Sequence, residues 1–149
     1  MRKLDLWLYK WYNWHLHEGS QELKIRKNIL GRIESAYDSK SKIANPLGTA
    51  LYIVGLMPEE RDLRPDEGAS IINENFTRSD KPSVGGLVLW EWPMGEPIGI
   101  MHLGVITRTN PLRITSRISK GLGVVIDSEF KKSSLYGHKV SEVKFYTRK

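Results

Sequence analysis

Apolar positions recur at helical spacing through the first half of the chain. The segment SQELKIRKNILGRIESAYDS, residues 20–39, carries such a stripe: Leu23, Ile29, Leu30, Ile33, Ala36 and Tyr37. A repeat of three and four residues is typical of an amphipathic helix, and Ser20 is a favourable N-cap at its start. The pattern therefore predicts a helix here. An earlier stripe of Trp7, Trp11 and Trp14 has the same spacing and indicates an apolar face for the core or for a partner.

The stretch IANPLGTALYIVG, residues 43–55, predicts a second helix with Asn45 as its N-cap. Pro46 suits the first helical position, because the N–H that proline lacks has no intrahelical partner there. The apolar residues that follow again have helical spacing. A charged loop with two prolines comes next, and EGASIINENF, residues 67–76, is a third and shorter helical candidate.

The pattern changes after Pro82 to short runs rich in Val, Ile, Leu and Trp, separated by Gly and Pro. We predict five strands: GGLVLWEWP, IGIMHLGVIT, LRITSRIS, LGVVID and EVKFYT. Strands that follow one another directly pair antiparallel, and helices followed by strands are typical of the α+β class. The sequence thus predicts a single domain over residues 1–149, with a helical half (about 1–76) packed on one face of an antiparallel five-stranded sheet (about 82–149).

Composition removes several classes of function. The 149 residues contain no cysteine, which excludes disulfides, zinc–thiolate sites and a cysteine nucleophile. No apolar run approaches the roughly 18 residues that a membrane span requires. The basic N-terminus is interrupted by polar residues from Asp5 onwards and lacks a signal-peptide core, so we expect a cytoplasmic protein. No nucleotide-binding or zinc-peptidase motif occurs, and we expect no cofactor and no metal.

The net charge of +6 comes from the second half, where residues 78–149 hold 12 Lys and Arg against 6 Asp and Glu. Four cations there form a candidate basic patch: Arg108, Arg113, Arg117 and Lys120. A solvated basic face is the simpler interpretation, and a nucleic-acid-binding surface is the alternative. Regular alternation along LRITSRIS places Arg113 and Arg117 on one face and Ser116 on the other, and we expect the arginines to face solvent.

Two stretches, NPLGTALYIVGL and GGLVLWEWPMGEPIGIMHLGVIT, resemble the NlpC-type cell-wall peptidases of the papain-like cysteine peptidase superfamily. The resemblance covers about residues 37–127 and implies a papain-like arrangement of helices and sheet. In that family a cysteine at the N-terminus of the central helix is the nucleophile. A histidine on a core strand is its base, and a polar residue on the next strand orients the histidine.

Residue by residue, the resemblance puts Pro46 at the cysteine position, His102 at the base and Ser116 at the orienting position. A helix N-terminus and an adjacent imidazole both favour a reactive thiolate, which proline cannot supply. The resemblance thus implies a remnant site without its nucleophile. It also implies a ligand groove near Tyr37, Asn45 and Trp90.

We therefore expect a catalytically degenerate NlpC-like domain that acts as a noncatalytic binding or interaction module for a peptide-like or protein ligand. One alternative is a hydrolase or acyltransferase with a relocated hydroxyl nucleophile, Thr49 or Ser116, and His102 as its base. The other is a nucleic-acid-binding module that uses the basic patch. The sequence leaves the oligomeric state open.

Overall fold

The computed structural model of the chain describes residues 21–38, 44–91, 100–130, 134–135, 138–139 and 142–149. The predicted tryptophan stripe at residues 7–14 lies outside the described residues. Three helices are described: α2 (Gln21–Asp38), α3 (Pro46–Ile53) and α4 (Pro65–Asn75). They lie where the helical periodicity predicts them. Among the described residues, no helix is both long and apolar enough to cross a bilayer.

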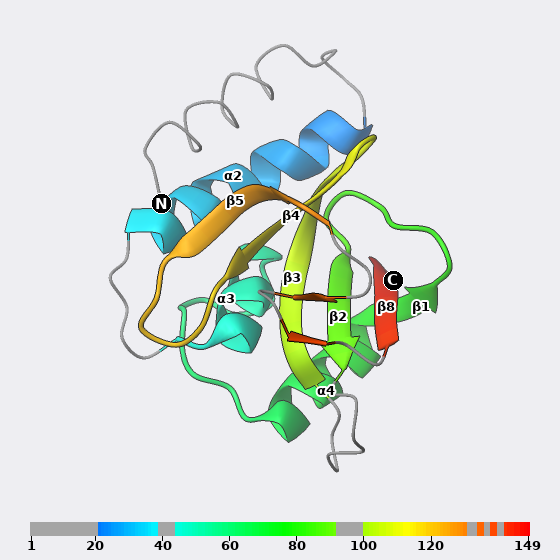
Figure 1. The fold of residues 1–149 in the computed structure, drawn as a ribbon. Coiled ribbons are helices and arrows are strands. Elements are labelled where there is room, and N and C mark those ends of the chain that lie inside the picture. Colours follow the sequence, from blue (N-terminus) through cyan, green and yellow to red (C-terminus); the bar gives the residue numbers. More distant parts are fainter. Residues whose placement is uncertain (1–20, 39–43, 92–99, 131–133, 136–137, 140–141) are drawn as a thin grey trace.

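The strands form a six-stranded antiparallel sheet in the order β1-β8-β2-β3-β4-β5. Figure 1 shows this order from green β1 on the right to orange β5 on the left. The strand bounds are β1 (Phe76–Ser79), β2 (Leu87–Glu91), β3 (Ile100–Thr109), β4 (Leu112–Arg117), β5 (Val124–Glu129) and β8 (Glu142–Arg148). Two short strands, β6 (Ser134–Leu135) and β7 (His138–Lys139), form a separate pair.

The α+β class and all five predicted strands are confirmed, but the strand count is not. The additional strand is β1, which begins directly after α4 and pairs with β8 at the edge of the sheet. Its four residues, FTRS, carry one buried apolar side chain and no clear alternation. A strand this short is fixed by its long-range partner rather than by local pattern. The boundary between the helical and sheet halves therefore falls at Phe76, six residues before the expected Pro82.

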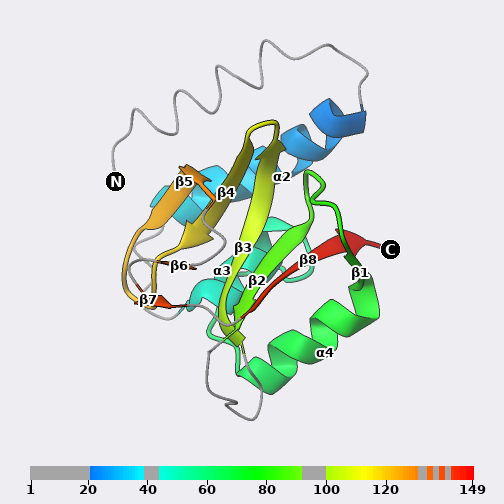
Figure 2. The same cartoon turned by 45° about the vertical axis from the view of Figure 1, so that its right-hand side comes forward.

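Each face of the sheet has its own apolar cluster. The helical face is the one on which α2, α3 and α4 pack, and its buried strand residues include Leu87, Leu89, Leu103 and Val105. The opposite face carries the second cluster, built on Val88, Trp90, Ile106 and Ile114. Figures 1 and 2 show the helices gathered on one side of the sheet, with α3 across the central strands. Alternation along β3 thus places Leu103 and Val105 on the helical face and Ile106 on the opposite face.

Candidate functional site

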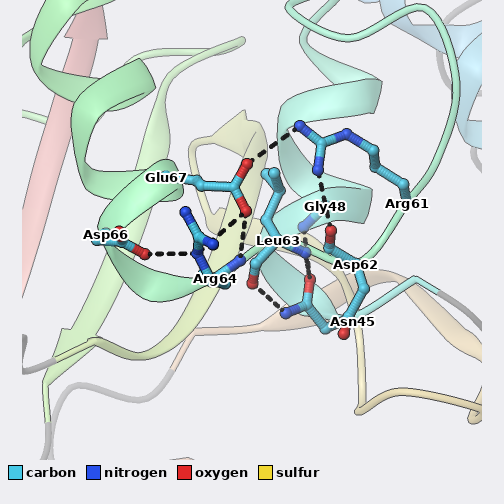
Figure 3. Close-up of polar contacts among 8 residues, drawn as sticks. All are labelled: Asn45, Gly48, Arg61, Asp62, Leu63, Arg64, Asp66 and Glu67. Atoms are coloured by element: carbon cyan, nitrogen blue, oxygen red, sulfur yellow. Dashed lines mark hydrogen bonds and ion pairs between the residues drawn. The ribbon is translucent and has the colours of Figure 1, made fainter.

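The start of α3 is held by Asn45. Its backbone is extended (φ −91°, ψ 174°), and its side-chain Oδ1 accepts a hydrogen bond from the Gly48 N–H at 2.9 Å, as an N-cap does. The same side chain makes two bonds to Leu63: Oδ1 accepts from the Leu63 N–H at 3.2 Å, and Nδ2 donates to the Leu63 carbonyl at 2.7 Å. Figure 3 shows Asn45 between the two backbones. The polar atoms of this candidate groove residue therefore join α3 to the loop before α4.

That loop packs directly on α3. A Cβ atom at Gly48 would lie 1.6 Å from the Arg61 carbonyl oxygen, so only glycine fits this position. A Cβ atom at Gly68 in α4 would lie 2.6 Å from Leu47 Cδ2, so the Leu47 side chain of α3 packs closely on α4 as well. Pro46 occupies the first position of α3, as the sequence predicts, and is half-buried. Gly48 of the NPLGTA segment thus allows the backbone of α3 to pack closely against the loop before α4.

The first turn of α4 is stabilised by charge. The Glu67 carboxylate accepts a hydrogen bond from the Arg64 N–H at 3.3 Å and pairs with the Arg61 guanidinium at 3.4 Å. Arg64 also pairs with Asp66 at 3.2 Å. Figure 3 shows these contacts beside the Asn45 bridge. Carboxylates in the first turn of a helix offset its unpaired N–H groups, so this cluster supports the loop against which Asn45 holds α3.

Arg117, the last residue of β4, lies on the helical face, where it is 2 % exposed. Its Nε donates to Thr49 Oγ1 at 2.7 Å, and one terminal nitrogen donates to Glu60 Oε1 at 2.9 Å. Thr49 in turn donates its own hydroxyl proton to Glu60 Oε1 at 2.9 Å. The guanidinium also donates to the backbone carbonyls of Leu122 (2.6 Å) and Ala36 (3.3 Å). We call Arg117, Glu60 and Thr49 the buried triad.

The buried triad corrects the expectation that Arg117 faces solvent. The predicted alternation along β4 is present, but the face that carries Arg117 is the face that the helices cover. A guanidinium has five N–H donors, and this one reaches α3, the loop at Glu60 and the end of α2 at once. It therefore connects four segments of the fold. Thr49 is fully buried, with both its proton and a lone pair in use, so it is not available as a nucleophile.

His102 lies on the opposite face of the sheet from α3. It pairs with Trp90 across β3 and β2, and the two ring centroids are 5.4 Å apart at an interplanar angle of 58°. Trp90 belongs to the apolar cluster of that face. The imidazole is 3 % exposed, and its burial lowers the pKa of His102 to about 4, so the ring is neutral at pH 7.

Ser116 lies on the same face as His102. A Cβ atom built on Gly104, between the two, would lie 3.4 Å from both Ser116 Cβ and Trp90 Cζ3. Ser116 is 2 % exposed. The structure thus brings Ser116, His102 and Trp90 together, but under packed side chains.

The expected groove between Pro46, His102 and Ser116 is not formed. Pro46 begins α3 on the helical face, whereas alternation along β3 and β4 directs the other two side chains to the opposite face. Tyr37 packs with the cluster under the helices, on the far side of the sheet from Trp90. The candidate groove residues therefore divide between the two faces as well.

The four cations of the candidate basic patch do not share a solvent face: Arg108, Arg113, Arg117 and Lys120. Arg117 belongs to the buried triad. Arg108 pairs with Asp127, which is itself buried, and Lys120 Nζ pairs with Asp62 Oδ2 at 3.2 Å. Arg113 is half-buried on β4. The excess of cations in the second half does not make a purely basic surface, because Asp62 comes from the first half of the chain.

In the described part of the chain, no three His, Asp or Glu side chains lie close enough together to hold a metal ion. No family model, curated protein or solved structure matches this chain.

Proposed function

We propose that this chain is a noncatalytic binding or interaction module for a peptide-like or protein ligand. One observation carries the proposal: His102 and the start of α3 are separated by the sheet. General base catalysis requires the base within hydrogen-bond reach of the proton that it accepts. The imidazole of His102 therefore cannot act as a base on a group held at Pro46 or Thr49.

The NlpC-type resemblance supports this proposal only by the order of its helices and strands. A capped helix precedes three consecutive antiparallel strands, β2, β3 and β4, as the resemblance implies. The roles that it assigns to His102 and Ser116 do not fit their places on the far face. We accordingly propose a binding role without transferring a catalytic or orienting role to either residue.

The hydrolase alternative keeps one favourable observation, since Ser116 and His102 share a face. Two features weigh against it. Both side chains are buried, which leaves no path for substrate. A base with a pKa near 4 also takes up the proton of a serine hydroxyl poorly, because the driving force for proton transfer falls with the basicity of the acceptor.

The test is turnover by the purified protein with peptide, ester and peptidoglycan substrates, accompanied by exposure to a serine-reactive fluorophosphonate. We expect no product and no mass adduct. Turnover that disappears in His102→Ala, or an adduct on Ser116, would replace the binding module with the hydrolase alternative. Binding itself is measured by amide chemical-shift changes on addition of cell-wall stem peptides, and the absence of shifts removes that ligand class.

A further inference from the structure

A cavity of about 980 Å³ lies beside the C-terminal end of α3. It is formed by one side of α2, the turn after α3, the loop that leads into β2 and the last residues of β8. Its apolar wall consists of Ile25, Ile29, Val54 and Val84. This volume is at the upper end of the roughly 300–1,000 Å³ typical of small-molecule sites.

The cavity is cationic. Lys27, Arg32 and Arg148 line it, and no Asp or Glu side chain does so among the residues that the structure describes. Lys149 also lines it, and its ammonium donates to the Asn73 carbonyl at 3.1 Å. Positively charged side chains therefore line one cavity, with no Asp or Glu among the described lining residues.

Both guanidinium groups are positioned by backbone contacts, and most of their donors have no partner among the residues that the structure describes. Arg148 donates one N–H to the Val54 carbonyl at 3.0 Å, and Arg32 donates one to the Asn28 carbonyl at 3.0 Å. Gly55 has a φ of 85°, a left-handed conformation that favours glycine, and a Cβ there would lie in van der Waals contact with the Arg32 guanidinium (3.4 Å to its central carbon). Each arginine keeps several of its five N–H groups for a ligand.

Two hydroxyls complete the polar lining. Ser83 Oγ and Thr147 Oγ1 lie 3.2 Å apart, and both border the cavity. The neighbouring amides are already in use, because the Gly85 N–H donates to the Ile106 carbonyl and the Gly86 N–H donates to the Ser83 carbonyl. A ligand in this cavity is therefore bound by side chains rather than by a backbone loop.

We infer that this cavity binds a phosphorylated small molecule of nucleotide size. Arginine forks match phosphate oxygens in pairs, and several cations balance a polyvalent anion, whereas a single carboxylate neutralises only one of them. The apolar wall then covers the organic part of the ligand. This inference goes beyond the proposed function and does not depend on it, because the cavity shares no residue with the buried triad or with the His102 face.

The test is isothermal titration of the full chain at low salt with ADP, inorganic pyrophosphate and a peptide with a free C-terminal carboxylate. We expect ADP to bind most tightly and its affinity to fall as salt is added. Arg32→Gln and Arg148→Gln each remove a charged donor and should weaken ADP binding by about ten- to a hundredfold. Arg78→Gln is the matched control, since Arg78 pairs with Glu142 outside the cavity, and it should bind ADP as the native chain does.

Lys27→Gln keeps the test decisive if an arginine variant unfolds, because Lys27 is exposed and makes no hydrogen bond or ion pair with the residues that the structure describes; it too should weaken ADP binding. The inference is wrong if ADP does not bind, if the cavity variants bind as the Arg78 variant does, if pyrophosphate binds as tightly as ADP, or if only the peptide binds. The ADP recovered after titration should be intact. Cleavage of a bound ligand would contradict the proposed noncatalytic function but not the cavity.

Discussion

Replacing Arg117 with methionine tests the structural role of the buried triad. Methionine keeps much of the side-chain volume but removes every guanidinium donor. Glu60, whose side chain is 8 % exposed, then retains its negative charge and the bond from the Thr49 hydroxyl but loses the guanidinium that pairs with it. The carbonyls of Ala36 and Leu122 lose the hydrogen bonds that Arg117 donates to them.

The magnitude follows from the burial of both charges. Removing one partner of a buried ion pair costs about 3–5 kcal/mol, because the other charge is left without compensation. At about 2–4 °C of melting temperature per kcal/mol in a chain of this size, Arg117→Met should lower the melting temperature by about 6–20 °C. Such a loss is a large part of the total stability of about 5–15 kcal/mol that is common for folded domains.

The assay is urea unfolding followed by tryptophan fluorescence, with thermal unfolding as a second readout. Lys120→Met is the matched control, because its pair with Asp62 is about half exposed on both sides (54 % and 48 %) and should contribute no more than about 1 kcal/mol. Adding Glu60→Leu to Arg117→Met removes the uncompensated charge and should recover part of the loss. An Arg117→Met variant as stable as Lys120→Met would refute the reasoning.

Three further predictions concern the remaining features of the site. Because burial lowers the pKa of His102 to about 4, the unfolded chain binds a proton between pH 6.5 and 4 that the folded chain does not. The free energy of unfolding should therefore decrease by about 3 kcal/mol as the pH falls from 6.5 to 4. His102→Leu should lose this pH-dependent component when unfolding free energies are compared at each pH. Gly48→Ala places a methyl group against the Arg61 carbonyl and should destabilise the fold by several kcal/mol. Gly31→Ala is the control, because nothing lies within 4 Å of a Cβ there, and it should stabilise α2 by about 1 kcal/mol. Equal effects of the two substitutions in chemical denaturation would contradict the close contact at Gly48. Pro46→Cys should yield a thiol that shows no hydrolase activity in ester and peptide assays, because the sheet separates it from His102, and turnover by this variant would restore the peptidase interpretation.

The sequence predicts the local elements well because their signals are local. Asn45 followed by Pro46 specifies the start of α3, and period-two runs specify the five long strands. The signal for Gly48 is also visible, as a glycine inside an apolar helix, although its partner is not. The short edge strand β1 was missed because its four residues carry no pattern and depend on pairing with β8.

The prediction of the candidate site was limited by tertiary structure rather than by local pattern. Alternation along β4 correctly separates Arg117 from Ser116, yet it does not say which face the helices cover. A buried arginine and an exposed one look alike in a single sequence, and the partners of Arg117 come from segments 57 and 68 residues away. From the sequence we therefore expect Arg117 to face solvent, and its place in the buried triad follows only from the fold. The cavity at Arg32 and Arg148 carries no sequence signal, because α2 and β8 are joined only by the fold.

The central claim is that the sheet separates His102 from the start of α3, and proton–proton contacts measured by NMR test it most directly. With His102, Trp90 and Thr49 assigned, we predict nuclear Overhauser contacts from the His102 ring to the Trp90 indole, whose centroids are 5.4 Å apart, and none to the Thr49 methyl group or the Pro46 ring. Contacts from the His102 ring to Thr49 or Pro46 would place the imidazole at the start of α3 and contradict the account.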